Sequence, residues 1–179
     1  MSTVTGSAAG EFEPIGAEDL ALDPLEDLEE QCLCALLWAH PAAARTVVAH
    51  LRPEDFHVPI YRELVEVVAT LVTEGVPHGT SMVVARLERD GRLGGHAGDR
   101  LRRAVVNATT AGADGGAVGH YARAVASAAY RRSFHQTGLA IAEAAQMLPE
   151  EQLFEHMVEL GRRQRAATER LAALRAVGL

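Results

Sequence analysis

The last third of the chain carries a heptad pattern, and this pattern restricts the fold more than any other feature. The recurrent positions are Leu153, Met157, Leu160, Gln164, Ala167, Leu171 and Leu174. A matching stripe precedes Pro149 and consists of Phe134, Gly138, Ile141, Ala145 and Leu148. Spacings that alternate between four and three keep side chains on one face of a helix. The pattern predicts two long helices that meet at Pro149 and form an antiparallel hairpin over residues 117–177.

The composition favours helices in the rest of the chain as well. Hydrophobic residues make up 48% of the sequence but aromatic residues only 4%, so leucine, valine and alanine must fill the core. Such a core suits close-packed helices better than sheets. We predict an all-α fold, with a compact helical bundle over residues 24–115 and the hairpin after it.

Prolines and glycines indicate where the helices of the bundle begin and end. Pro24, Pro41 and Pro59 are expected to begin the first three helices, and Gly75 to end the third. We expect Thr80 or Ser81 to cap a fourth helix that ends at Gly91. Residues 91–98 are predicted to form a loop, residues 99–110 a fifth helix, and residues 111–119 a glycine-rich connection.

The stretch "LRPEDFHVPIYR" predicts a structural corner before the third helix. Pro53, Glu54 and Asp55 are expected to turn the chain, with the two acids acting as caps and helix-dipole partners. Phe56 and Tyr61 are expected to anchor the corner to the bundle. Arg62 is expected to begin the solvent-facing side of the third helix.

The acidic residues are concentrated at the start of the chain. Residues 1–30 hold nine acids and no base, whereas the other fifteen acids and all seventeen bases follow. Residues 1–22 are predicted to be a disordered acidic arm. Three roles are open for it: a solubilising tail, a segment that folds against the arginine face of this chain, or a segment that occupies a partner's basic groove.

Several classes of chemistry are disfavoured. The chain contains no lysine, which excludes a Walker-type phosphate loop and lysine Schiff-base catalysis. The eight histidines form no recognisable ligand set with other residues, and no serine lies in a glycine-framed elbow. Cys32 and Cys34 are interpreted as small buried apolar residues. We therefore predict no catalytic residue, no cofactor and no metal site.

Neither a secretory leader nor a membrane span is expected. No apolar run approaches the roughly 20 residues that a spanning helix needs, and the first residues lack a basic region followed by an apolar one. The sequence predicts a cytoplasmic protein without a membrane partner.

The arginines leave two interpretations open. One cluster runs from Arg86 to Arg103 and another from Arg162 to Arg170, each interleaved with acids. Solvated faces or protein-contact rims are the leading interpretation, with direct nucleic-acid binding weak or absent. The alternative is a small helical DNA-binding regulator that uses the Arg86 to Arg103 region.

The order of motifs resembles one family over residues 25–177: the N-terminal domain of the DnaB-type bacterial replicative helicase. The resemblance rests on the stretches "LEEQCLCALLWAHPAA", "LRPEDFHVPIYRELVEVVATLVTEGVP", "MVVARLERDGRLGG" and "HYARAVASAAYRRSF". Within the second stretch, Leu51, Asp55, Phe56, Arg62 and Gly75 fall on recurrent positions of the family. Tyr61 replaces the usual histidine, and a glycine-rich stretch replaces the usual link before Tyr121.

The resemblance implies a collar module without a motor. In that family the N-terminal domains pair through their hairpins and build a ring collar, which the C-terminal domain of the primase contacts; helicase loaders act on the assembly too. ATP hydrolysis resides in a RecA-like domain, which this sequence does not contain.

We therefore expect a non-enzymatic replication protein. It should self-associate as a dimer or higher oligomer and contact the replicative helicase or the primase. The candidate residues for partner binding or self-association are Phe134, Ile141, Leu148, Leu153, Met157, Leu160, Gln164, Leu171, Leu174, Arg131 and Arg132.

Overall fold

A computed structural model describes residues 24–176, with side chains from Asp27 onward. Its helices are α1 (Pro24–Trp38), α2 (Pro41–Val48), α3 (Pro59–Glu74), α4 (Thr80–Arg89), α5 (Gly95–Thr110), α6 (Val118–Met147) and α7 (Glu150–Ala176), with short 3₁₀ helices η2 (Pro53–Asp55) and η3 (Gly115–Ala117). No strand occurs in the described residues, so the predicted all-α class is confirmed. The predicted arm, residues 1–22, lies outside the described residues.

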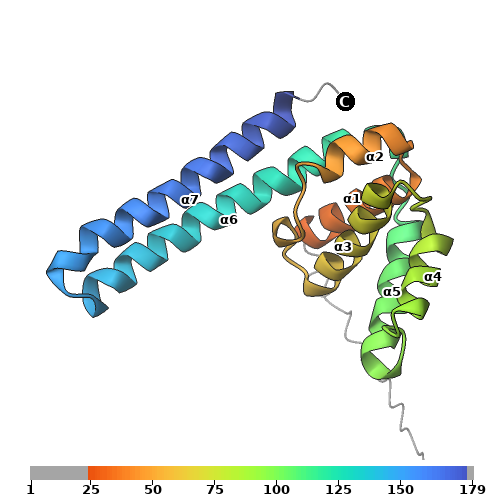
Figure 1. Cartoon of the computed structure of the whole chain (residues 1–179), viewed down its shortest axis with the longest axis horizontal. Coiled ribbons are helices and arrows are strands. Elements are labelled where there is room, and N and C mark those ends of the chain that lie inside the picture. Colours follow the sequence, from red (N-terminus) through yellow and green to blue (C-terminus); the bar gives the residue numbers. More distant parts are fainter. Residues whose placement is uncertain (1–23, 177–179) are drawn as a thin grey trace, which may run out of the picture.

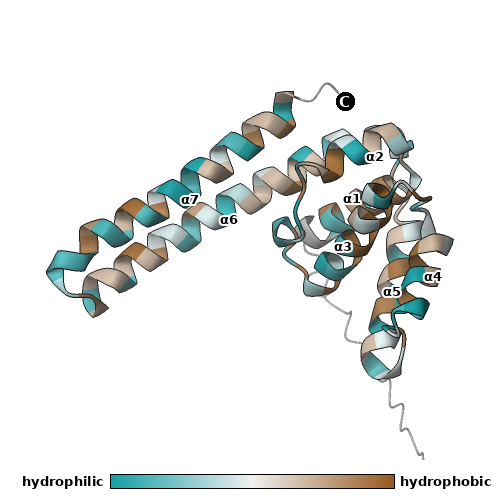
Figure 2. Cartoon of the chain, viewed as in Figure 1, coloured by the Kyte–Doolittle hydropathy of each residue, from teal (hydrophilic) through white to brown (hydrophobic). Residues whose placement is uncertain are grey.

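Helix α1 is the centre of the bundle because other helices surround it. It contacts α3, α5 and α6, and every residue from Cys32 to Leu37 is buried. Phe56 adds the largest of the fully buried side chains. Figure 2 shows brown, hydrophobic segments on both α1 and α3, with teal segments between them. The core is thus built mostly from aliphatic side chains, as the composition predicts.

Most of the predicted helix ends agree with the structure. Pro41 and Pro59 begin their helices, and Gly75 ends α3 with a left-handed φ of 73°. The predicted cap of α4 is wrong. Gly79 occupies the cap position without a side-chain hydrogen bond, and Thr80 is already helical. The Thr80 hydroxyl instead lies 2.9 Å from the Thr109 hydroxyl, so it links α4 to α5.

The start of α5 also differs from the prediction. The helix begins at Gly95, inside the stretch predicted to be a loop. A Cβ atom on Gly98 would lie 2.1 Å from the Leu93 carbonyl carbon. Glycine at position 98 therefore permits the tight turn that brings Leu93 against the first turn of α5, although glycine alone argues against a helix.

Helices α6 and α7 form the predicted antiparallel hairpin, whose closed end extends away from the bundle (Figure 1). Leu148, whose backbone is extended, and Pro149 separate them. The first turns of α6 belong to the bundle core, where Val118, Ala122 and Val125 are buried. One helix thus runs continuously from the bundle into the hairpin. The division into domains at 24–115 and 117–177 stays a prediction.

Candidate protein-interaction site

The hairpin is fixed to the bundle by an ion pair between a buried carboxylate and a partly buried arginine. Asp55, in the corner before α3, is 2% exposed. Arg170 of α7 donates to both of its carboxylate oxygens, at 2.5 Å from Nη1 and 2.6 Å from Nη2. The same guanidinium donates to the His50 carbonyl at 3.0 Å. A bidentate pair of this kind fixes direction as well as distance, so it determines where α7 lies on the bundle.

Helix α6 contributes a second arginine to the same corner. Arg132 donates from Nη2 to the Asp55 carbonyl at 2.5 Å, and its Nη1 lies 3.8 Å from the buried Glu29 carboxylate. Glu29 in turn accepts hydrogen bonds from the backbone N–H groups of His57 and Val58, at 2.5 and 3.0 Å. We call Glu29, Asp55, Arg132 and Arg170 the corner clamp. It ties α1, the corner and both hairpin helices together.

Cys32 lies near the clamp and is fully buried. Burial raises the pKa of its thiol strongly, and the nearby carboxylates of Glu29 and Asp55 raise it further. The thiol therefore stays protonated at neutral pH and is a poor nucleophile.

The corner itself agrees with the sequence prediction in most respects. Pro53–Asp55 forms a 3₁₀ turn, and Phe56 and Tyr61 are buried at 0% and 8% exposure. The expected role of Asp55 was incomplete, because a cap alone does not account for its ion pair with α7. Arg62 is exposed as expected, and its guanidinium also donates to the Phe56 carbonyl at 2.6 Å.

The half of the hairpin nearer the bundle has a polar seam. Gln164 donates to the Ser133 hydroxyl at 2.9 Å and accepts from the Thr137 hydroxyl at 3.3 Å. One turn nearer the bundle, the Tyr130 and Thr168 hydroxyls lie 2.9 Å apart. The polar side chain of Gln164, at a heptad position, therefore has its hydrogen-bond partners within the same chain.

The far half of the hairpin carries an open apolar surface. A shallow depression of about 350 Å³ is lined by Ile141, Ala144, Ala145, Leu153, Phe154, His156 and Met157. Phe154 is 71% exposed, Met157 46% and Ile141 41%. We call Ile141, Leu153, Phe154 and Met157 the tip patch. Contiguous exposed apolar groups are typical of protein interaction sites.

The structure divides the sequence-predicted site residues into four groups. Leu160, Leu171 and Leu174 are buried within the chain, and Leu148, Leu153 and Gln164 are partly buried. Phe134, Ile141, Met157 and Arg131 are exposed, whereas Arg132 belongs to the corner clamp. The role of the set in partner binding stays a prediction.

The heptad argument missed three exposed apolar residues, Leu139, Met147 and Phe154. They lie outside the alternating four-three positions, which mark a single face of each helix. The sequence did carry a signal for a second contact surface, namely large apolar side chains that do not lie on that face.

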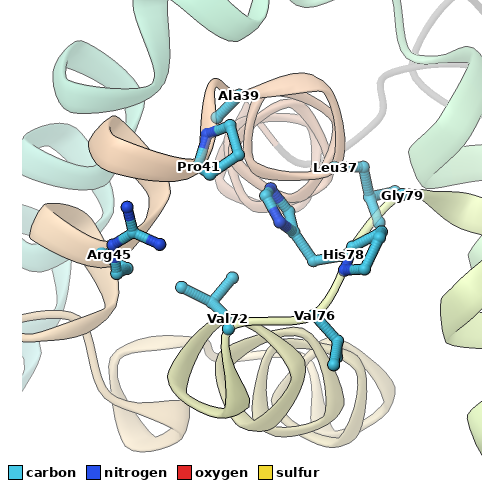
Figure 3. Close-up of a pocket in the computed structure, with 10 residues that line it drawn as sticks. Leu37, Ala39, Pro41, Arg45, Val72, Val76, His78 and Gly79 are labelled. Atoms are coloured by element: carbon cyan, nitrogen blue, oxygen red, sulfur yellow. The ribbon is translucent and has the colours of Figure 1, made fainter.

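A second depression, of about 330 Å³, lies between the end of α1, α2 and the turn after α3 (Figure 3). His78 is 5% exposed, and its ring extends from this turn toward Pro41. Burial lowers the pKa of His78, and backbone hydrogen bonds to Ala39 and Leu36 oppose that shift. The imidazole is therefore neutral at pH 7. Among residues 24–176, no group of three or more His, Cys, Asp or Glu side chains is placed to hold a metal ion.

No helix in the described part of the chain is long and apolar enough to cross a membrane.

Comparison with known proteins identifies the family. The model of the DnaB-like helicase N terminal domain matches residues 23–127, which is more than half of the chain. Among solved structures, the crystal structure of the N-terminal domain of DnaB helicase from Mycobacterium tuberculosis is similar, with a TM-score of 0.60 and 22% sequence identity. That match covers 78% of this chain and 93% of the other, so it extends the shared fold into the hairpin. The chain belongs to the DnaB-like helicase N-terminal domain family.

Proposed function

We propose that this protein acts in DNA replication as an interaction module that self-associates through the tip patch and contacts the replicative helicase or the primase. The observation that carries the proposal is the exposure of Phe154, Met157 and Ile141, which line one apolar depression at the closed end of the hairpin. Family membership supports the replication context.

The tip patch is a better candidate for self-association than the half of the hairpin near the bundle. There, the polar groups already have partners, and Leu171 and Leu174 are buried with Ala126. At the tip, one face of each helix remains open because the hairpin has only two helices. Packing two tips around a twofold axis would bury the same patch on both copies.

The proposed role is non-enzymatic. The family match is to the helicase N-terminal domain, and the chain has no lysine for a Walker-type phosphate loop. A phosphate-release assay with ATP and added DNA tests this directly. ATP hydrolysis above the protein-free background would contradict the proposal if this activity copurifies with the chain.

Partner capture tests the interaction role. The immobilised chain is offered the purified replicative helicase and, separately, the purified primase from the same host. We expect retention of at least one. The double variant Ile141→Glu/Phe154→Glu should lose self-association, whereas the matched variant Met82→Glu/Val106→Glu, at exposed apolar positions of the bundle, should keep it. If neither protein is retained and the wild-type chain is monomeric at tens of micromolar, the proposal fails.

The alternative of a DNA-binding regulator has less support. Arg86, Arg92 and Arg102 form ion pairs with Glu74, Glu63 and Asp99, at 2.9, 2.7 and 3.1 Å. Carboxylates so close weaken the positive field that would attract phosphates. A mobility-shift titration with duplex DNA at low salt separates the two functions, since steeply salt-dependent binding would favour the regulator.

A further inference from the structure

A groove between the start of α3 and α5 combines an apolar floor with a basic rim. Its volume is about 500 Å³. The floor includes Val58, Pro59, Ile60 and Ala104, and Arg100 and Arg103 line its α5 side. Such a surface suits an extended segment that carries both large apolar and acidic side chains.

The two rim arginines carry charge that the described residues do not neutralise. Glu63 also lines the groove, but it is paired with Arg92 at 2.7 Å. Asp99 is paired with Arg102 at 3.1 Å. Within residues 24–176, neither Arg100 nor Arg103 has an ion-pair partner. Two positive charges therefore remain on the rim.

The start of the described chain lies beside this groove. Glu29 accepts a hydrogen bond from the Val58 N–H at 3.0 Å, and Glu30 accepts one from the Tyr61 hydroxyl at 2.5 Å. These contacts place the second turn of α1 against the groove wall. Pro24 precedes Glu30 by six residues, which corresponds to about 9 Å along a helix. The first described residue, Pro24, is therefore within about 9 Å of this contact along α1.

We propose that residues 11–20 of the same chain, "EFEPIGAEDL", dock in this groove. The segment carries four acids (Glu11, Glu13, Glu18, Asp19) and three large apolar residues (Phe12, Ile15, Leu20), with no base. Its charge complements the rim, and its apolar side chains suit the floor. Few residues separate it from Pro24, and each spans up to about 3.5 Å. Attachment on the same chain gives an effective concentration on the order of millimolar.

Paramagnetic relaxation on the full chain tests the docking. A nitroxide is attached to an Ala17→Cys variant, and amide signals are recorded. Native Cys32 and Cys34 are 0% and 1% exposed, so wild-type protein serves as the labelling control. We expect the amide signals of Ile60, Ala104 and Asn107 to broaden selectively. The signal of Val76, at the other end of α3, should broaden several-fold less.

Charge-reversed variants define the specificity. Broadening should disappear in Arg100→Glu/Arg103→Glu and persist in Arg45→Glu/Arg165→Glu, a matched pair of exposed arginines away from the groove. It should also weaken as salt rises from about 0.1 M to about 1 M, because the screening length falls from about 10 Å to about 3 Å. Equal broadening at Val76 and the groove, or broadening that survives Arg100→Glu/Arg103→Glu, would overturn the proposal.

A mixed sample shows whether the segment docks on its own chain or on a second copy. Protein that carries the nitroxide but no nitrogen-15 is combined with nitrogen-15-enriched protein that carries no nitroxide. We expect no groove broadening in this mixture. Broadening as strong as in the singly prepared sample would show that the segment docks on another copy, and the same-chain proposal would be wrong. The readout does not depend on whether the tip patch self-associates.

Discussion

The bundle and the hairpin achieve stability in different ways. In the bundle, α1 is surrounded by three helices, and six consecutive residues, Cys32 to Leu37, are buried. In the hairpin, α7 packs mainly on α6, and Phe154 remains 71% exposed. A helix with neighbours on several sides can bury its whole circumference, whereas a two-helix hairpin leaves a face of each helix open. The open face is therefore where contacts with other proteins are expected.

The two regions also differ in what joins their elements. Aliphatic packing around Phe56 joins the helices of the bundle. The hairpin is instead attached by the corner clamp and joined near the bundle by hydrogen bonds such as that between Gln164 and Ser133. Directional polar contacts fix orientation but contribute less net stability than apolar burial. We infer that the bundle supplies most of the stability and that the clamp sets the direction of the hairpin.

Among the changes that compare the bundle with the hairpin, removing the largest core side chain should have the strongest effect on stability. Phe56 is 0% exposed, so Phe56→Ala should lower the free energy of unfolding by about 3–5 kcal/mol. Phe154→Ala, at the exposed tip, should change it by less than about 0.5 kcal/mol. Urea unfolding followed by circular dichroism measures both. Similar losses for the two variants would mean that the tip is packed within the monomer.

Breaking the clamp should have the next largest effect. Asp55→Asn leaves Arg170 without its buried carboxylate, and we expect a loss of about 3 kcal/mol. Hydrogen exchange should show lost protection in the last turns of α7 before any loss in α1. The double variant Asp55→Asn/Arg170→Met should be less destabilised than the sum of the single variants. Additive losses would show that the pair is not coupled.

A pair of glycine substitutions compares a constrained position with an open one. Gly75 has a φ of 73°, so Gly75→Ala should destabilise the bundle by about 1 kcal/mol. Gly161 is an exposed residue within α7, and outside its own helix backbone no atom lies within 4 Å of the place that a Cβ would take. Gly161→Ala should therefore stabilise the hairpin by about 0.5–1 kcal/mol. Thermal unfolding of both variants checks the opposite signs.

The smallest expected effect is the pH dependence of stability that arises from His78 in the bundle. The pKa of His78 is lowered in the folded state. Just below pH about 6.5, the unfolded chain therefore binds more protons than the folded chain does. Stability linked to His78 is therefore present above that pH and falls as the pH decreases. His78→Phe should flatten this part of the stability profile. An unchanged pH slope in His78→Phe would show that the burial of His78 has no such linkage.

The sequence predicted the helices better than the contacts between them. Prolines and Gly75 mark helix ends through local backbone preferences, so these ends were predictable. The start of α5 was not, because it depends on the close approach of Gly98 to Leu93, which are brought together by a tight turn. The heptad pattern predicted one face of the hairpin, on which Leu160 and Leu171 are buried but Ile141 and Met157 are exposed. It did not indicate the tip patch residue Phe154, which lies off that face.

The corner clamp was beyond sequence reasoning for a similar reason. Asp55 and Arg170 lie 115 positions apart, and each has an adequate local explanation as a turn residue or a surface arginine. Only the path of α6 and α7 over the bundle brings them together. Long-range polar pairs leave no periodic signal of the kind that identifies an apolar face.

Sedimentation velocity over a range of concentrations tests the central claim, which is that the tip patch mediates self-association. The wild-type chain should sediment as a dimer or larger species at tens of micromolar. Ile141→Glu/Phe154→Glu should remain monomeric with an unchanged urea midpoint, and Met82→Glu/Val106→Glu should behave as wild type. A monomeric wild-type chain, or an oligomer that persists in Ile141→Glu/Phe154→Glu, would contradict the claim.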